Sequence, residues 1–179
     1  MSGHNKWTQI KHKKGAEDIK RSKLFSMLVR TINVEARLAN GNREAPGLKA
    51  AIARAKAANM PLDNIERAIE KGSGAGAESF EEVVYEAYGP GGVALLIVGL
   101  TDNKNRTTPE IKHLLSKHGI SLSPQGATQW AFIKKEDEWQ AQNTLPLAKT
   151  EQEKLQALLE ALGEHEDIKN IFHNADEIA

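Results

Sequence analysis

Positively charged side chains are concentrated near the start of the chain, where they could bind phosphate groups. Residues 3–37 contain nine Lys or Arg and only three Asp or Glu. Lys and Arg neutralise nucleic-acid phosphates, and a Trp among them can stack on an exposed base. The residues predicted to bind nucleic acid are Lys6, Trp7, Lys11, His12, Lys13, Lys14, Lys20, Arg21, Lys23, Arg30 and Arg37.

Each of these assignments has a structural alternative. Lys23, Arg30 and Arg37 lie seven residues apart and could form an ordinary solvated helix face. The charge of the segment before them favours nucleic-acid contact. Trp7 could instead pack against the following helices as a core anchor, and both interpretations of this residue stay open.

Net charge divides the chain into two halves. Residues 1–72 hold fifteen basic and seven acidic residues, a net charge of +8. Residues 73–179 hold nine and seventeen, a net charge of −8, so the whole chain is neutral. This asymmetry indicates a half that faces nucleic acid, joined to an acidic half.

A second polar cluster lies at residues 101–106, where catalysis could be sought. No nearby His or second carboxylate supplies an acid and base pair, so capping of the following helix explains the cluster better and no enzyme is predicted. The tight turn at 89–92 could also present its amides to a phosphate. Secondary nucleic-acid contacts are predicted at Gly91, Gly92, Asn103, Asn105 and Arg106.

Metal and cofactor chemistry is not expected. The chain has no Cys, and His4 and His12 lie in the basic segment, which would repel a cation. His113 and His118 lie on or near a helix that must pack. No apolar run approaches the ~18 residues of a membrane helix, so we expect a cytoplasmic protein with no membrane partner. A monomer is also predicted.

Helical periodicity predicts a bundle in the basic half. The first helix covers residues 16–39, with a core face of Leu24, Phe25, Leu28, Val29, Ile32, Ala36 and Ala39. It ends at Asn40 and Gly41, which tolerate a left-handed backbone. Two shorter helices follow at 48–59 and 62–72, the last ending at Gly72. Residues 1–72 are therefore predicted to form a basic arm and a three-helix bundle, and the glycine-rich residues 73–78 a linker.

Extended patterns dominate the acidic half. Strands are predicted at 82–88, 93–100, 128–133 and 168–172, and the second, almost wholly apolar, should be central. Thr108 and Pro109 should open a helix with the buried face Ile111, Leu114, Leu115 and His118. Thr150 and Glu153 form a capping box before a second helix. The prediction for 79–179 is a two-layer α+β domain of order ββαβαβ with a mainly antiparallel sheet.

Five segments resemble signature segments of the YebC family. They read GHNKWTQIKHKKGAEDIKR, ANMPLDNIERAIEKGSG, YEAYGPGGVA, LTDNKNRT and NIFHNAD, and they occur in the family's order. The match runs from residue 1 to about 132 and resumes near 146. Asn5 and Ser22 stand where the family usually has Ser and Gly. Familiar members carry a third, ferredoxin-like domain where this chain has only a short loop at 134–146.

The resemblance implies a role in gene expression. The family includes bacterial proteins described as transcriptional regulators and a mitochondrial translational activator. A mobile basic arm with one Trp suits folded RNA, whereas the bundle lacks a clear base-reading helix. The predicted function is a ribosome-associated translation factor that binds rRNA and relieves stalled translation, and the alternative is a DNA-binding transcriptional regulator.

Overall fold

The computed structural model describes residues 14–74, 79–135 and 138–176, with side chains from Lys20 onward. The chain divides into two compact units. A helical unit contains the described residues of 11–82 together with 100–103, and an α+β unit contains those of 83–99 and 104–179. The fold is therefore mixed α+β with an N-terminal helical region, as the sequence predicts.

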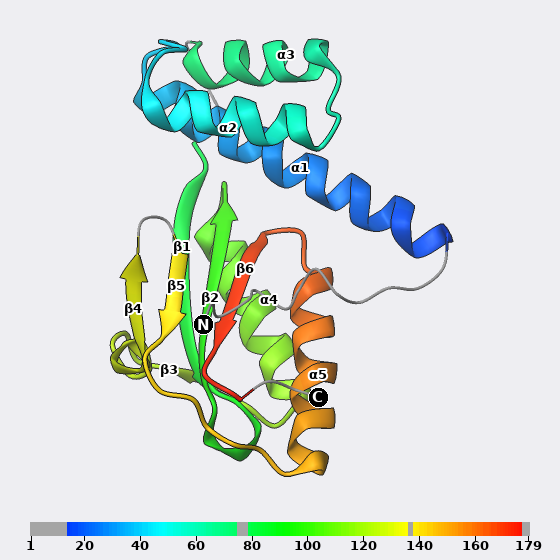
Figure 1. Cartoon of the computed structure of the whole chain (residues 1–179), viewed down its shortest axis with the longest axis vertical. Helices are drawn as coiled ribbons and strands as arrows, with labels where there is room; N and C mark the ends of the chain where they lie inside the picture. Colours follow the sequence, from blue (N-terminus) through cyan, green and yellow to red (C-terminus); the bar gives the residue numbers. More distant parts are fainter. Residues whose placement is uncertain (1–13, 75–78, 136–137, 177–179) are drawn as a thin grey trace. The chain divides into compact units, whose positions relative to one another are not determined.

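Three helices form the helical unit: α1 (Lys14–Leu38), α2 (Pro46–Ala57) and α3 (Leu62–Ser73). Figure 1 shows α2 and α3 running in opposite directions, and α1 contacts both. Their apolar faces meet in one core because each presents small or branched residues at helical spacing. The buried members are Ile32, Ala36, Leu48, Ala51, Ala55, Met60, Ile65, Ala68 and Ile69.

One prediction for the helices needs correction, since Leu24, predicted to lie in the core, is 49% exposed. Gly72, predicted to end α3, is the last residue but one of that helix, and it is buried where an added Cβ would be 2.5 Å from the carbonyl oxygen of Asn33. The glycine therefore lets α3 approach the backbone of α1. The predicted end of α1 is confirmed, since Asn40 and Gly41 have φ of 48° and 77°.

The main sheet of the α+β unit has the strand order β3-β1-β2-β6. Its strands are β1 (Glu81–Tyr88), β2 (Ala94–Thr101), β3 (Leu122–Ser123) and β6 (Ile168–His173). β3 is antiparallel to β1 and β6 is antiparallel to β2. As predicted, β2 is central and buried along its whole length, because its apolar run has neighbours on both faces.

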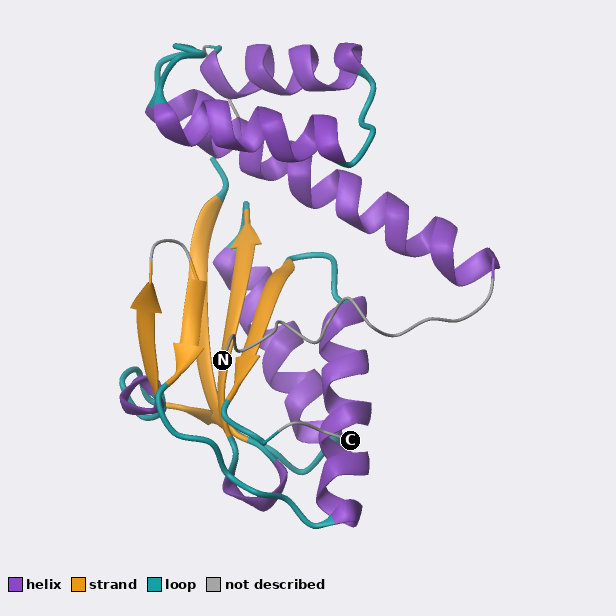
Figure 2. Cartoon of the chain, in the orientation of Figure 1, coloured by secondary structure: helices purple, strands orange, loops and turns teal. Residues whose placement is uncertain are grey.

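Each face of this sheet has its own cover. Helices α4 (Lys104–Lys117) and α5 (Lys149–Glu164) lie on one face (Figure 2), where Leu115 and Leu158 pack with Leu95 and Ile97. On the other face, Leu96 packs in a cluster with residues of a separate hairpin. That hairpin consists of β4 (Phe132–Lys135) and β5 (Glu138–Ala141).

The order of elements differs from the prediction because three short features were missed. β3 has two residues, β5 lies in the segment predicted to be a loop, and half of the predicted strand at 128–133 is a short 3-10 turn over Gln129–Ala131. The observed order is ββαβββαβ. Strands of two to four residues leave too little alternation to be recognised in a sequence.

The two helices of this unit also begin differently from the prediction. α4 starts at Lys104, so Pro109 lies inside it and removes one intrahelical hydrogen bond instead of opening the helix. His118, predicted to be buried, is exposed beyond the end of α4. α5 starts after Ala148 without a side-chain cap, so the predicted capping box is not formed.

A buried carboxylate holds the loop before β4. Glu86 on β1 is 2% exposed and accepts hydrogen bonds from the backbone N–H of Gly126 (2.6 Å) and Thr128 (2.7 Å) and from Gln129 Nε2 (3.1 Å). Burial alone would raise the pKa of Glu86. The hydrogen bonds from Thr128 and Gly126 outweigh it, so the pKa is lowered.

Replacing this carboxylate should destabilise the α+β unit in a pH-dependent way. Glu86→Gln is expected to lower the free energy of unfolding by about 1–2 kcal/mol at pH 7, because an amide NH₂ would face backbone donors. Because the pKa of Glu86 is lower in the folded state, its ionised carboxylate stabilises the fold at pH values above the ordinary pKa of 4.5. This stabilisation is lost as the pH falls through the pKa of the folded state. The difference between parent and variant should therefore shrink in acid. Urea unfolding at neutral and acidic pH measures it, with the exposed Glu153→Gln as control, and a difference independent of pH would contradict the prediction.

Candidate nucleic-acid interface

The described cations of α1 do not all have the same surroundings. Lys20, Arg21 and Arg37 are exposed, whereas Lys23 and Arg30 are half-buried. Lys14 is the first residue of α1, and its side chain is outside the described set. The remaining predicted contacts also lie outside the described residues: Lys6, Trp7, Lys11, His12 and Lys13.

Arg30 is held in place by two contacts within the helical unit. Its Nη1 donates a hydrogen bond to the carbonyl oxygen of Leu100 at 3.1 Å, and its guanidinium carbon lies 5.3 Å from the centre of the Phe80 ring. Arg21 similarly lies 5.3 Å from the ring centre of Phe25. The cations of α1 are thus partly ordered by aromatic neighbours, which reduces the freedom a phosphate contact would have to remove.

Helix α2 adds cations that were not among the predicted site residues. Lys49, Arg54 and Lys56 lie on its exposed side, and the helix has no acidic residue. The sequence contains these cations, but the alanines around them indicate close helix packing, and no contact was predicted for this helix. Residues 20–74 together hold eleven basic and five acidic residues, a net charge of +6. Over all the described residues of the helical unit (14–74, 79–82 and 100–103) the net charge is +2, so the positive charge is concentrated in residues 20–74.

Ion pairs between residues outside α1 neutralise part of this positive charge. Arg43 donates two hydrogen bonds to the carboxylate of Glu66 on α3, and these bonds lower the pKa of Glu66. Lys49 Nζ lies 3.0 Å from an oxygen of Glu44. All four side chains are largely exposed, so these pairs contribute little to stability.

The predicted secondary contacts are engaged inside their own units. In the turn at Pro90–Gly92, the Gly92 N–H donates to the Gly89 carbonyl at 3.1 Å, and an added Cβ on Gly91 would lie 2.5 Å from Leu147. Both glycines have positive φ, so the turn needs them for its own geometry. The Asn103 N–H donates to Thr101 Oγ1 at 2.9 Å.

The polar residues at the start of α4 also have structural partners. Asn105 is exposed, and Arg106 Nη2 donates to Asp167 Oδ2 at 3.0 Å. The buried Thr107 hydroxyl donates to the same oxygen at 2.5 Å. This part of the polar cluster therefore ties α4 to the segment before β6, which supports a structural role over catalysis.

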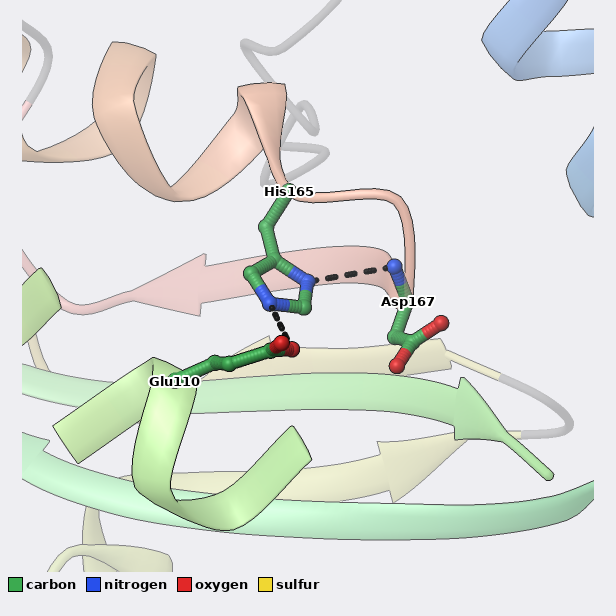
Figure 3. Close-up of side chains that lie close together, drawn as sticks. All are labelled: Glu110, His165 and Asp167. Atoms are coloured by element: carbon green, nitrogen blue, oxygen red, sulfur yellow. Dashed lines mark hydrogen bonds and ion pairs between the residues drawn. The ribbon is translucent and has the colours of Figure 1, made fainter. Parts of the chain in front are cut away.

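One group of side chains in the α+β unit has the donor types of a metal site. Glu110, His165 and Asp167 place potential ligand atoms within 4.8 Å of one another (Figure 3). The Asp167 N–H lies 3.2 Å from His165 Nδ1, and His165 Nε2 lies 3.1 Å from Glu110 Oε2. Sequence reasoning missed the group, because Glu110 and His165 are 55 positions apart.

The hydrogen bonds of this group oppose metal binding. Since a backbone N–H can only donate, it requires a lone pair on Nδ1 and leaves the proton of neutral His165 on Nε2, directed at Glu110. A metal bound to Nε2 would move that proton to Nδ1, where it would face the Asp167 N–H. A histidine that binds a metal normally donates its second N–H to an acceptor, and here Nδ1 meets a donor instead. Asp167 is already bound by Arg106 and Thr107. The arrangement fits a hydrogen-bonded junction between α4 and the end of α5.

The comparisons with known proteins assign the chain to a family. The model of the TACO1/YebC protein N-terminal domain matches residues 5–75, and that of the TACO1/YebC second and third domain matches residues 80–137. With a basic helical unit followed by an α+β unit, the chain belongs to the TACO1/YebC family.

Its relatives include curated proteins and one solved structure. A probable transcriptional regulatory protein of Fervidobacterium nodosum is 55% identical over 137 residues, which is 75% of this chain and 54% of that protein. One of the same name from Carboxydothermus hydrogenoformans is 58% identical over 137 residues, with 75% and 56% covered. The chain thus spans about half the length of these relatives. The crystal structure of a conserved hypothetical protein from Aquifex aeolicus is similar with a TM-score of 0.83, 33% identity, and 95% and 96% of the two chains covered.

Within the parts of the chain that the structure describes, no helix is both long enough and apolar enough to cross a bilayer.

Proposed function

We propose that this protein regulates gene expression by binding RNA through its helical unit, and that its target is the RNA of the ribosome, where it assists stalled translation. The observation that carries the proposal is the net charge of +6 on residues 20–74, displayed by exposed cations of α1 and α2. A surface of this kind binds phosphates without reading sequence and gives affinity that falls with salt.

RNA is favoured over duplex DNA by the chemistry of α3. In a helix-turn-helix protein the second helix after a short turn enters the major groove and reads bases with its N-terminal residues. Here that helix would be α3, which follows α2 after residues 58–61. It carries Asp63, Glu66 and Glu70 against Arg67 and Lys71, and so would be repelled by the groove phosphates. The cations lie instead on helices suited to irregular backbone contact, as in folded RNA.

A second candidate is regulation of transcription by DNA binding. It is favoured by the printed names of the curated relatives, which are called probable transcriptional regulatory proteins. In that case the same cations would contact duplex phosphates, and specificity would come from DNA shape or from a partner, not from α3.

Crosslinking in living cells separates the two candidates. Nucleic acid joined to the protein by ultraviolet light would be purified with it under denaturing conditions and sequenced. We expect rRNA fragments clustered at a few positions. Promoter fragments without rRNA would support the second candidate instead, and a profile matching that of an unrelated neutral protein would overturn both.

A further inference from the structure

A hollow of about 400 Å³ lies on the helical unit, bordered by one face of α1, by Lys71 of α3 and by Phe80, which precedes β1. From α1 come Phe25, Ser26, Arg30 and Asn33, among others, and Phe80 closes it. This size falls within the ~300–1,000 Å³ of ordinary small-ligand sites.

The walls have the chemistry of a site for a flat, electron-rich ring attached to an anion. Phe80 and Arg30, whose guanidinium carbon lies 5.3 Å from the ring centre, are the two side-chain types on which unpaired bases stack. Lys71 of α3 adds a second cation, and none of the described residues that line the hollow carries a carboxylate.

Asn33 gives an independent indication. The residue is 4% exposed, and its Oδ1 accepts no hydrogen bond from the described residues. An acceptor buried without a donor destabilises a fold by about 1–3 kcal/mol, so a bound group that donates a hydrogen bond to Asn33 Oδ1 would remove this penalty. Every nucleobase carries at least one N–H on its Watson–Crick edge.

We propose that this hollow receives one unpaired base of single-stranded RNA, stacked at Phe80 and Arg30, with an adjoining phosphate near Lys71 and an N–H of the base directed to Asn33. The proposal rests on the proposed function, since it names the part of the RNA that the helical unit binds. Stacking does not depend on base identity, so the site should tolerate any sequence.

The test compares two labelled probes on the intact protein at fixed salt. One is a short oligoadenylate RNA, and the other is a matched oligomer of the same backbone whose residues are abasic. Ser22→Leu with Ser26→Leu fills the hollow with side chains that cannot stack, and both serines are exposed. The matched control is Ala53→Leu with Ala57→Leu, two exposed positions of α2 with the same spacing. Phe80→Leu is a second variant that removes the aromatic ring while keeping an apolar side chain.

The parent should bind oligoadenylate about 10-fold more tightly than the abasic oligomer, as expected for one stacked base. The filled variant and Phe80→Leu should lose that preference, with affinity for the abasic oligomer unchanged, and the α2 control should keep it. Equal, salt-dependent binding of both probes by the parent would overturn the base site but leave RNA binding intact. Binding of neither probe would overturn the proposed function and the base site together. A preference retained in both hollow variants would place the stacked base elsewhere and overturn this inference alone.

Discussion

Removal of Lys20, Arg21 and Arg37 together is expected to weaken RNA binding about 100-fold at 0.1 M salt. All three side chains are exposed on α1. Each phosphate contact contributes about 0.7 to 0.9 to the slope of log affinity against log salt, so three lost contacts should lower the slope by about 2–3. Fluorescence anisotropy of a labelled RNA across a salt series gives both quantities.

The matched control removes the same charge from the α+β unit. Lys112, Lys117 and Lys149 are also exposed, and their triple alanine variant changes net charge equally. We expect less than a ~3-fold change in affinity and the parent's slope, because screened charges away from the contact surface contribute little. Equal losses in the two triple variants would mean that overall charge, and not the surface of α1, attracts the RNA.

Gly72→Val is expected to lower the stability of the helical unit by about 2–3 kcal/mol. An added Cβ would lie 2.5 Å from the Asn33 carbonyl oxygen and 2.7 Å from its Cα, and backbone cannot move aside as a side-chain tip can. The helices α1 and α3 would have to separate, with loss of contacts such as those of Ile32 and Ile69 in the shared core.

Hydrogen exchange localises this effect. Amides of α1 and α3 should exchange faster in Gly72→Val, while those of β2 in the other unit serve as an internal reference. Ala57→Val, at an exposed position of α2, introduces the same side chain and should cost only the helix-propensity difference of about 0.5 kcal/mol. Protection in α1 and α3 equal to the parent's would show that the backbones accommodate the side chain.

Sequence periodicity predicted the elements that bury long apolar faces. The core stripe of α1 through Ile32 and Ala36 and the apolar run of β2 were sufficient to place a helical region before an antiparallel α+β layer. Local patterns were less informative where tertiary contacts decide the outcome. Gly72 lies next to the end of α3, as its residue type suggests. The sequence does not reveal that a glycine is needed there because the backbone of α1 passes close to it.

The candidate sites also differ in how far the sequence could predict them. Cations close together in the sequence, such as Lys20 and Arg21, could be identified as a basic surface without a structure. The hollow could not, since it joins Asn33 to Lys71 and Phe80 from two other segments. The Glu110 and His165 pair likewise depends on the packing of α4 against α5. Residues brought together over such separations leave no spacing that a sequence pattern can reveal.

The short length of β3 has a consequence for how the protein behaves when concentrated. β1 has eight residues, yet β3 pairs with only Glu86 and Ala87 of that strand. Among the described residues, the rest of this edge of β1 has no ladder partner, and an unpaired sheet edge is where another chain can add a strand. Glu81 and Glu82 place charged side chains at the start of that edge, and charged side chains on an edge strand disfavour strand addition.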